Sequence, residues 1–367
     1  MKNDRIPLHL GERSYDILIA DDRYRNLGSH LKRLRIGTKA LVVTNPAVYR
    51  KHAKDFTQSL RQARITPFFA KNFPTNEKAK SLASLTKLID LLVKSRADFV
   101  ICFGGGVLGD LTGFGASVYK RGIPYIQVPT TFLAQVDSAI GGKTAVDLPE
   151  GKNLLGAFYQ PRLVYSELSV LRELPDENIQ DGLAEAIKCG MIYSESFFRF
   201  IETHAEKLLK KDTKSLRTVV RSCSQIKASI VKQDEYDKKG KRIILNYGHT
   251  LGHALEQVAG YHTRHGRAIS VGMLMAADIS EALGLFGTRE VERLENLLKR
   301  VRLPITLLEL NRRHWNIDRI LEAEGRDKKF VHGKNRYVLP IRIGKVIVRE
   351  GIPYSLIRKV ISKRLGG

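Results

Sequence analysis

Short β-branched runs alternate with helical patterns over the first third of the chain, and this alternation is the strongest limit on its fold. Four runs are expected to form strands, at residues 39–44, 65–70, 98–103 and 124–128. The intervening segments 46–63 and 77–95 place apolar residues at helical spacing. Strand–helix–strand repetition is typical of a parallel sheet with helices on both faces. We therefore expect an α/β domain with a Rossmann-like parallel sheet over residues 1–168.

Beyond residue 168 the strand-like runs nearly vanish. Helical patterns cover five segments, at 176–193, 213–233, 250–259, 268–283 and 288–301. Two late β-rich runs, 336–341 and 345–349, predict one hairpin. The second domain, residues 169–367, is therefore expected to be mainly α-helical.

The chain is strongly basic, with 62 Lys and Arg against 38 Asp and Glu and a formal net charge of +24. Such an excess can indicate a nucleic-acid binder, a protein of anionic membrane surfaces, or an enzyme for polyanionic small molecules. The cations are spread along the chain and interleaved with acids, which favours the enzyme and no specific nucleic acid. Residues 355–367 are the exception, with four cations and no acid.

Cysteine use and hydropathy indicate the compartment. The three cysteines, Cys102, Cys189 and Cys223, are too few and too scattered for a disulfide framework, so a reducing interior is expected. No apolar run reaches the roughly 18 residues that span a bilayer, and no apolar leader follows the charged residues 1–5. We expect a cytoplasmic protein with no membrane partner.

A glycine-rich turn, residues 104–110, follows the 98–103 strand and precedes an apolar helical segment. Glycines at 104, 106 and 109 would let the backbone approach a pyrophosphate at a helix N-terminus, although a plain tight turn fits as well. The turn lies far from the first strand, and no acid ends the 124–128 strand, unlike the usual dinucleotide fingerprint. Ribose contacts would then come from elsewhere, and Glu77 is a candidate.

Lysines beside glycines mark the stretch 135–161. Lys143 follows two glycines, Lys152 and Asn153 follow Gly151, and Asp137 lies nearby. Each lysine alone would be read as a surface charge. Together they predict an anion site, because small neighbours let an ammonium group reach a ligand.

Four of the ten histidines lie between His249 and His265. His249 and His253 are spaced i, i+4, which places both on one helix face, so spacing alone selects them as a metal-binding pair. Glu185 is an acid within an apolar helix. It could complete a metal site, or it could simply pair with Lys188 at i+3.

Several long motifs now resemble one family. GGGVLGD, RGIPYIQVPTTFLAQVDSAIGGKTAVDLPEGKNLLGAFYQP, GLAEAIKCG, LNYGHTLGHALE, HGRAISVGM and RDKK occur in this order. From about Glu77 to Lys329 the chain resembles 3-dehydroquinate synthase, a sugar phosphate cyclase family. The resemblance implies one divalent metal, Zn or Co, bound by Glu185, His249 and His265, with His253 near the substrate phosphate. This ligand set replaces the pair His249 and His253 that the i, i+4 spacing selected.

The resemblance also implies the other site residues. NAD contacts fall on Glu77, Lys80, Gly106, Val107, Leu108, Gly109, Asp110, Thr130, Thr131, Lys143, Lys152 and Leu171. Catalytic positions fall on Asp137, Lys143, Lys188, Lys227, Arg242, Asn246 and His253. Further substrate contacts fall on Lys152, Asn153 and one of Lys328 and Lys329. Arg121 matches an arginine that reaches the neighbouring subunit's site, so a homodimer is implied.

The implied reaction converts a sugar acid phosphate, 3-deoxy-D-arabino-heptulosonate 7-phosphate, to 3-dehydroquinate and phosphate. It proceeds by transient oxidation with NAD, elimination of phosphate, re-reduction and an intramolecular aldol closure. The alternatives are a cyclase of the valiolone or inosose type, an oxidoreductase like glycerol dehydrogenase, and a basic nucleic-acid-binding protein. The 3-dehydroquinate synthase reaction is favoured, because a substrate with a carboxylate needs the extra cations. The residues that support it are Lys227, Arg242, Asn246 and His253.

Two positions depart from the family pattern. The chain has His265-Gly266-Arg267 where the family usually has His-Gly-Glu. We expect the Arg267 side chain to point outward. Thr75-Asn76-Glu77 replaces Asp-Gly-Glu, which keeps the acid and removes a glycine.

Overall fold

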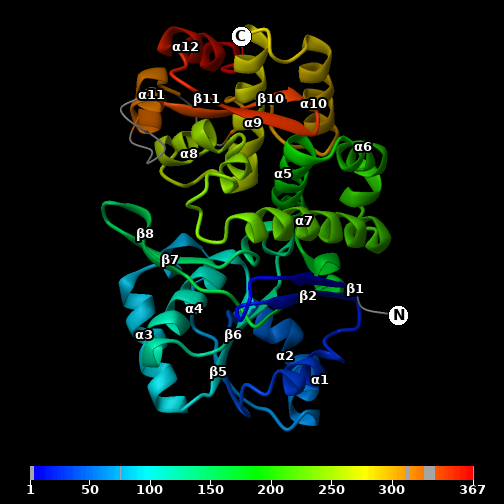
Figure 1. Ribbon diagram of the computed structural model, residues 1–367, viewed down its shortest axis with the longest axis vertical. Helices are drawn as coiled ribbons and strands as arrows, with labels where there is room; N and C mark the ends of the chain where they lie inside the picture. Colours follow the sequence, from blue (N-terminus) through cyan, green and yellow to red (C-terminus); the bar gives the residue numbers. More distant parts are fainter. Residues whose placement is uncertain (1–3, 75, 311–314, 326–334, 367) are drawn as a thin grey trace. The chain divides into compact units, whose positions relative to one another are not determined.

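A seven-stranded, mostly parallel sheet organises the first part of the chain in the computed structural model (Figure 1). The structure describes residues 4–74, 76–310, 315–325 and 335–366. It divides into two compact units. Unit 1 comprises Met1–Pro175 and Leu216–Tyr236, and unit 2 comprises Asp176–Ser215 and Asp237–Gly367. The domain division expected between residues 168 and 169 remains a prediction.

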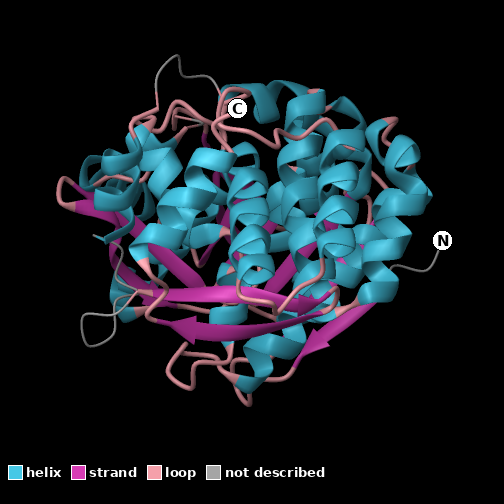
Figure 2. Cartoon of the chain, turned by 90° about the horizontal axis from the view of Figure 1, so that it is seen from above, coloured by secondary structure: helices cyan, strands magenta, loops and turns pink. Residues whose placement is uncertain are grey.

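The sheet of unit 1 has the strand order β1-β2-β9-β6-β5-β3-β4. Its strands are β1 (Asp4–Leu8), β2 (Tyr15–Ala20), β3 (Lys39–Val43), β4 (Thr66–Ala70), β5 (Phe99–Gly104), β6 (Tyr125–Pro129) and β9 (Leu163–Glu167). All neighbours are parallel except β1 and β2. Strands β5, β6 and β9 are buried along their whole length, as expected of parallel strands inside an α/β layer. The predicted fold class is confirmed, and Figure 2 shows these strands in magenta.

The helices of unit 1 are α1 (Leu27–Leu34), α2 (Pro46–Gln62), α3 (Leu82–Ser95) and α4 (Gly106–Val118). Among them, α2 and α3 start at side-chain caps, whereas α1 and α4 have none. The Asn45 side chain accepts hydrogen bonds from the first turn of α2. The helix predicted over 77–95 begins later, because Ser81 caps α3 and a short 3₁₀ turn, η1 (Glu77–Ala79), precedes it.

Residues 143–158 form an antiparallel hairpin of β7 (Lys143–Leu148) and β8 (Gly151–Phe158), which the sequence analysis did not predict. A Cβ on Gly156 would lie 2.3 Å from the Thr144 carbonyl oxygen, so glycine permits this close pairing. Three short helical turns lie beside strands of the sheet. The turn η2 (Tyr119–Arg121) precedes β6, the π-helical η3 (Ala134–Ser138) follows β6, and η4 (Leu168–Glu173) follows β9.

Unit 2 is mainly helical, as predicted. Its elements are α5 (Asp176–Tyr193), α6 (Glu195–Leu209), η5 (Arg242–Asn246), α8 (His249–Val258), α9 (His265–Ala282), α10 (Thr288–Arg300), α11 (Ile317–Gly325), α12 (Tyr354–Lys363) and the hairpin β10 (Arg336–Arg342) with β11 (Lys345–Glu350). Helix α7 (Thr213–Gln233) begins in unit 2 and continues in unit 1. All five predicted helices and the late hairpin are present, whereas α6 and α11 were not expected.

The basic C-terminal segment is largely paired within unit 2. Arg364 is buried and donates to both carboxylate oxygens of Asp278, at 2.6 and 2.9 Å, and to Glu295 at 2.7 Å. Lys363 also contacts Asp278, and Arg358 contacts Asp318. These cations therefore attach α12 to its neighbours. Among the described helices, none has the length and apolar character needed to cross a membrane.

Candidate functional site

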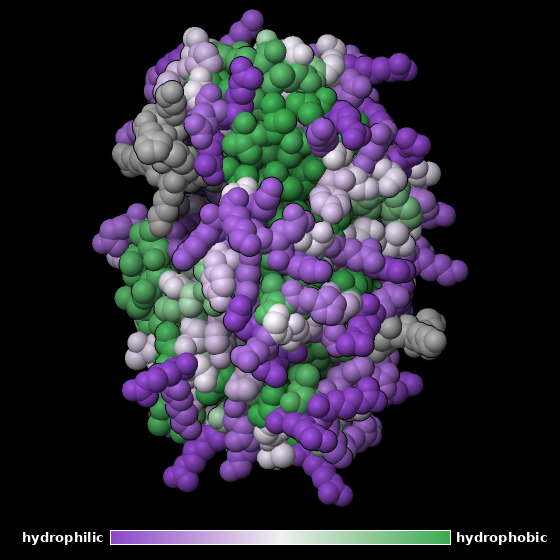
Figure 3. All heavy atoms as spheres, in the orientation of Figure 1, coloured by the Kyte–Doolittle hydropathy of each residue, from purple (hydrophilic) through white to green (hydrophobic). Residues whose placement is uncertain are grey.

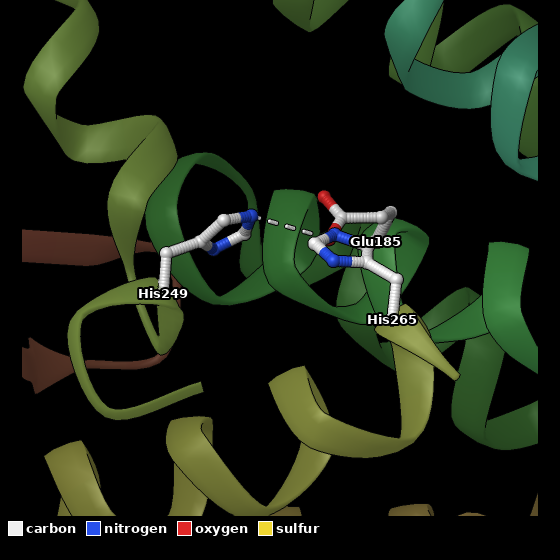
Figure 4. A group of neighbouring side chains, drawn as sticks. All are labelled: Glu185, His249 and His265. Atoms are coloured by element: carbon white, nitrogen blue, oxygen red, sulfur yellow. Dashed lines mark ion pairs between the residues drawn. The ribbon is translucent and has the colours of Figure 1, made fainter. Parts of the chain in front are cut away.

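Three helices of unit 2 bring Glu185, His249 and His265 together (Figure 4). Glu185 lies in the buried middle of α5, His249 is the first residue of α8, and His265 is the first residue of α9. Glu185 Oε1 lies 3.5 Å from Nε2 of His249 and 3.4 Å from Nε2 of His265. One ligand atom from each residue lies within 4.8 Å of the other two, which is close enough for a shared ion.

Glycines allow the helices that carry these ligands to approach closely. A Cβ on Gly272 of α9 would lie 2.1 Å from the carbonyl oxygen of Gly248, the residue before His249. A Cβ on Gly266 would lie 2.4 Å from the Cα of Asp181 in α5. Gly248 itself has a φ of 76°, a left-handed conformation suited to glycine. The ligand positions therefore depend on backbone contacts that a larger residue would disturb.

The outer ring nitrogens of both histidines are engaged. His249 Nδ1 lies 3.0 Å from the Tyr247 carbonyl oxygen, and His265 Nδ1 lies 3.2 Å from Glu256 Oε1. Hydrogen bonds to these acceptors engage Nδ1 as the donor, so Nε2 is the nitrogen that faces Glu185 and would bind a metal ion once any proton on it is displaced. This is the arrangement that histidine ligands of metals usually show.

The electrostatics of the group keep the Glu185 carboxylate ionised. Burial would raise the pKa of Glu185, but Lys188 and His265 outweigh it and lower the pKa to about 2. Burial lowers the pKa of His265, whereas Glu256 and Glu185 raise it to about 10. Glu185 is 1% exposed, and neither of its oxygens accepts a well-directed hydrogen bond. One buried carboxylate and two imidazoles therefore fit Zn²⁺ or a similar first-row ion.

Lys188 and His253 border this group. The Lys188 ammonium contacts Glu185 Oε2, so the i, i+3 ion pair considered from the sequence does form, inside a buried site. His253 is half exposed, and its Nε2 lies 4.0 Å from Glu256 Oε2. The compact group around Glu185 includes His249 and His265, whereas His253 belongs to a second group with Glu256 and His265.

Glu256, Asp181 and Arg264 were missed from the sequence. Arg264 precedes His265 and binds Asp181 of α5 through two nitrogens, at 2.8 and 2.7 Å. Asp181 stands four residues before Glu185, and Glu256 three residues after His253, so helical spacing could have suggested both. Arg267, expected to point outward, is half-buried and donates to the Glu309 carbonyl oxygen at 2.6 Å.

The glycine-rich turn of unit 1 connects β5 to α4. Gly105 caps α4 without a side-chain hydrogen bond, and the first turn contains no acid. A Cβ on Gly106 would lie 2.4 Å from Ser138 Oγ, so the close approach there requires glycine. The backbone N–H of Thr130 donates to the Gly104 carbonyl oxygen at 2.9 Å. The turn and residues 130–131 therefore lie together at the carboxyl ends of neighbouring strands, where α/β sheets commonly bind nucleotides.

The other residues expected to contact NAD are spread over nearby elements. Val107, Leu108, Gly109 and Asp110 lie in the first turns of α4. Leu171 is buried in η4, which follows β9, the neighbour of β6. Their contacts with the cofactor remain predictions.

Lys80 stands at the centre of a polar network in unit 1. Its ammonium donates to Asp110 Oδ2 at 2.8 Å and to Asn153 Oδ1, and it lies 3.7 Å from Glu77 and 4.0 Å from Asp147. Burial lowers the pKa of Lys80, but the surrounding carboxylates outweigh it and the net pKa is raised. Lys80 thereby links α4, η1 and the β7–β8 hairpin.

The remaining expected site residues lie in both units. Lys152 Nζ lies 3.6 Å from Glu77, and Lys227 donates to Asp137 Oδ1 at 2.8 Å and to its carbonyl oxygen at 2.7 Å. Lys143 is exposed at the start of β7, and Arg121 is exposed at the end of η2. In unit 2, Arg242 is buried at the start of η5 and Asn246 ends it. Lys328 and Lys329 lie outside the described residues.

Comparison with known proteins decides the family. Residues 70–181 match the family model 3-dehydroquinate synthase N-terminal, and residues 182–330 match 3-dehydroquinate synthase C-terminal. The chain belongs to the 3-dehydroquinate synthase family. The resemblance drawn from the motifs is therefore confirmed.

Relatives in this family align over nearly the whole chain. The 3-dehydroquinate synthase of Thermodesulfovibrio yellowstonii is 40% identical over 98% of this chain and all of its own length. That of Syntrophotalea carbinolica is 42% identical over 95% of this chain and 96% of its own. A crystal structure of 2-deoxy-scyllo-inosose synthase, complexed with carbaglucose-6-phosphate, NAD⁺ and Co²⁺, is 26% identical with a TM-score of 0.87, covering 99% of this chain and 100% of its own.

Proposed function

We propose that this chain is a 3-dehydroquinate synthase that uses NAD and one divalent metal ion. It converts 3-deoxy-D-arabino-heptulosonate 7-phosphate to 3-dehydroquinate and phosphate. The observation that carries the proposal is the group of buried Glu185 and His249 with half-buried His265, in a chain 40% identical to named synthases along its length. The conversion is redox-neutral overall, which separates it from a dehydrogenase that releases NADH.

Glu185 and the Nε2 atoms of His249 and His265 would hold the metal ion. A divalent ion bound there supplies Lewis-acid polarisation of the substrate's oxygens. Tyr247 and Glu256 orient the two imidazoles, and Lys188 balances the Glu185 carboxylate from the opposite oxygen. Lys188 is also positioned to donate to a substrate hydroxyl, since its ammonium lies beside the metal group.

The glycine turn and the start of α4 would hold the NAD pyrophosphate. NAD bound there supplies a reversible hydride acceptor. The uncapped N–H groups of α4 and the close approach at Gly106 suit a phosphate group. Thr130 and Thr131, on the adjoining strand end, would donate hydroxyl hydrogen bonds, and Glu77 would accept from a ribose.

The substrate carries a phosphate and a carboxylate, and the predicted cations bind these groups. Lys143, Lys152, Arg242 and Lys227 would supply charge, and Asn153 and Asn246 neutral hydrogen bonds. Several cations together restrict the substrate to one orientation and stabilise its developing charge. Half-exposed His253, next to Glu256, would hold the phosphate and receive or return a proton.

Phosphate release from the heptulosonate phosphate, with and without a chelator, tests this proposal. We expect chelator-sensitive release with no net change in NADH absorbance. If the protein turns over sedoheptulose 7-phosphate but not the heptulosonate phosphate, it is another type of cyclase. Steady NADH production from glycerol would assign it to the dehydrogenases. A glycerol dehydrogenase structure, with a TM-score of 0.63 at 15% identity, shares only the fold.

We also propose a homodimer in which Arg121 reaches the partner's site. Arg121 is exposed and directly follows Lys120 in η2, so its side chain is available to a second copy. Mixed dimers test this. An Arg121→Ala chain paired with a chain inactivated at His249 should regain activity, because one of the two sites is then intact. Absence of rescue would contradict the role across the interface.

A cytoplasmic location is proposed as well. The three cysteines are free and buried, which is typical of proteins from reducing compartments.

A further inference from the structure

The connections that enter the parallel strands of unit 1 carry one exposed cation after another. Arg35 and Lys39 lie at the entry to β3, Arg64 at β4, Arg96 at β5 and Lys120 at β6. All five residues are exposed. We call this set the basic edge. It lies at the amino ends of the strands, opposite the edge where the glycine-rich turn lies.

The sheet places these cations in a row. Strands β6, β5, β3 and β4 are consecutive neighbours, with Lys39 paired to Thr66, Ala40 to Phe99 and Val100 to Tyr125. Since neighbouring strands lie about 4.8 Å apart, the row crosses about 14 Å. Along the chain the connections into these four strands lie far apart, so their convergence follows from the topology.

The three arginines of the basic edge are not neutralised by the described acidic residues, whereas Lys39 and Lys120 interact with the Asp98 carboxylate. Arg35, Arg64 and Arg96 form no ion pair with any described acidic residue. Exposed arginines elsewhere do form pairs, as Arg172 does with Asp21 at 2.8 Å. The acid on these connections is Asp98, and its carboxylate accepts backbone N–H groups of Thr38 and Lys39, at 2.8 and 2.9 Å.

Helix ends alone do not explain these cations. A cation in the last turn interacts favourably with the helix dipole, and α1, α2 and α3 already have Lys32, Arg33, Arg61 and Lys94 there. The additional residues Arg35, Arg64 and Arg96 have φ values of 52°, 62° and 48°. That left-handed conformation favours glycine or asparagine and disfavours arginine. Lys211 and Arg302 take the same conformation after α6 and α10, so the feature that distinguishes the three arginines is their placement on neighbouring strands and not their conformation.

The chemistry of the edge points to a chain of phosphates. Guanidinium groups bind phosphate oxygens through two hydrogen bonds. Ile65 and Ala97 on the same connections are buried, whereas Val93 and Val118 beside them are exposed, so the test includes vesicles as a competing ligand. Tyr119 donates its hydroxyl to the Leu92 carbonyl oxygen, which ties it to α3 and argues against base stacking. In Figure 3, long hydrophilic side chains project from the end of unit 1 where Figure 1 shows α1 and the end of α3.

We propose that the basic edge binds the phosphate backbone of nucleic acid, independently of base sequence. Its three arginines, Arg35, Arg64 and Arg96, are not among the residues proposed for the synthase site, and the proposal does not depend on the synthase proposal.

The test compares two triple variants with the same net charge. The edge variant carries Arg35→Asn, Arg64→Asn and Arg96→Asn, because asparagine tolerates the left-handed conformation. The control carries Lys207→Asn, Arg289→Asn and Arg302→Asn, three exposed positions of unit 2, of which Arg302 is also left-handed with a φ of 59°. Fluorescence anisotropy with a labelled single-stranded RNA measures affinity across a salt series, and thermal unfolding confirms that both variants fold.

We expect the edge variant to bind RNA at least tenfold more weakly than wild type at moderate salt. The slope of log K against log salt should fall by about 2, since each lost contact to a single strand contributes about 0.7. The control should change affinity less than twofold, and both variants should keep wild-type phosphate release.

Equal weakening in both variants would show that net charge alone drives binding and would overturn the proposal. Absence of RNA binding by the wild-type protein at moderate salt would do the same. Preferential binding of inorganic polyphosphate or of phosphatidylserine vesicles, lost in the edge variant, would assign the edge to that ligand instead of nucleic acid.

Discussion

At the scale of single residues, Glu256 connects two histidines with different proposed roles. Its Oε1 lies 3.2 Å from His265 Nδ1, and its Oε2 lies 4.0 Å from His253 Nε2. The carboxylate is nearly buried, so it competes little with water for these partners. Glu256 therefore holds the His265 ring in the orientation that directs Nε2 at Glu185.

Replacing Glu256 with alanine should weaken metal binding by about 10- to 100-fold, because loss of an orienting carboxylate commonly has that effect. Glu256→Gln should lose less, since the amide oxygen still accepts a hydrogen bond. Competition with a chromophoric chelator measures the affinity without substrate. The control is His262→Ala, at an exposed histidine outside both groups. Unchanged affinity in Glu256→Ala would contradict the orienting role.

The roles of the histidines are separable. His249→Ala and His265→Ala should each lose bound metal, whereas His253→Ala should retain metal and lose rate, because its ring faces Glu256. Metal content of the purified variants and phosphate release are the two measurements. Metal loss from His253→Ala with retention in His265→Ala would make the spacing-based pair the correct one.

At the scale of elements, the crossing of α5 and α9 determines where His265 lies. Gly266 packs against the Asp181 backbone, and Arg264 binds the Asp181 carboxylate from the same turn. The two contacts fix the start of α9 beside the helix that carries Glu185. A shift of either helix would separate the ligands.

Gly266→Ala should therefore cost about 1–3 kcal/mol of stability, typical of an overpacked interior, and should also weaken metal binding. A matched change is Gly325→Ala, where the nearest atom to the new Cβ, Tyr354 Oη, is 4.0 Å away. Chemical denaturation and metal affinity are measured for both. If Gly266→Ala matches wild type in both measurements, the crossing does not control the site.

The entry to β3 depends on the ionised form of Asp98. Its carboxylate accepts N–H groups of Lys39 and Thr38, and these hydrogen bonds lower its pKa below the ordinary value of 3.8. The contribution to stability is therefore complete above that value and is lost as the pH falls through the lower, folded-state pKa. The difference in unfolding free energy between wild type and Asp98→Asn should shrink on acidification. A difference that grows toward low pH would contradict this account.

At the scale of the whole molecule, the charge excess has more than one structural basis. In the C-terminal segment Arg364 is 5% exposed and Asp278 is 2% exposed, so that part of the excess serves packing within unit 2. At the basic edge Arg35, Arg64 and Arg96 form no ion pair with a described acidic residue, whereas Lys39 and Lys120 interact with Asp98. The net positive charge therefore includes buried cations in ion pairs and exposed cations at the basic edge.

Removal of the buried guanidinium should be severe. Arg364→Ala leaves the exposed Lys363 as the described cation on the buried Asp278 carboxylate. We expect a loss of up to about 3 kcal/mol, since complete loss of the partner of a buried charge typically costs about 3–5 kcal/mol. Lys359→Ala, one helical turn earlier and exposed, should have almost no effect. Thermal and chemical unfolding of the two variants checks this. Similar stabilities would show that α12 does not depend on its buried ion pair.

The sequence by itself determined the elements and the family. Periodicity predicted the buried strands and most helices, because alternation along one element reflects local backbone geometry. It failed at 143–158, where the turn-like glycines belong to a hairpin, and at 77–81, where a serine cap delays α3. The long motifs identified the family without any structure.

Only the tertiary structure decided which side chains meet. Spacing i, i+4 places His249 and His253 on one helix face, yet it contains no information about α5 and α9. The group of Glu185, His249 and His265 closes because three helices pack at glycines, and Glu256 joins it through the same packing. The basic edge arises in the same way, since strand order places residues distant in sequence side by side. Distances between elements are set by long-range packing, which a local pattern does not record.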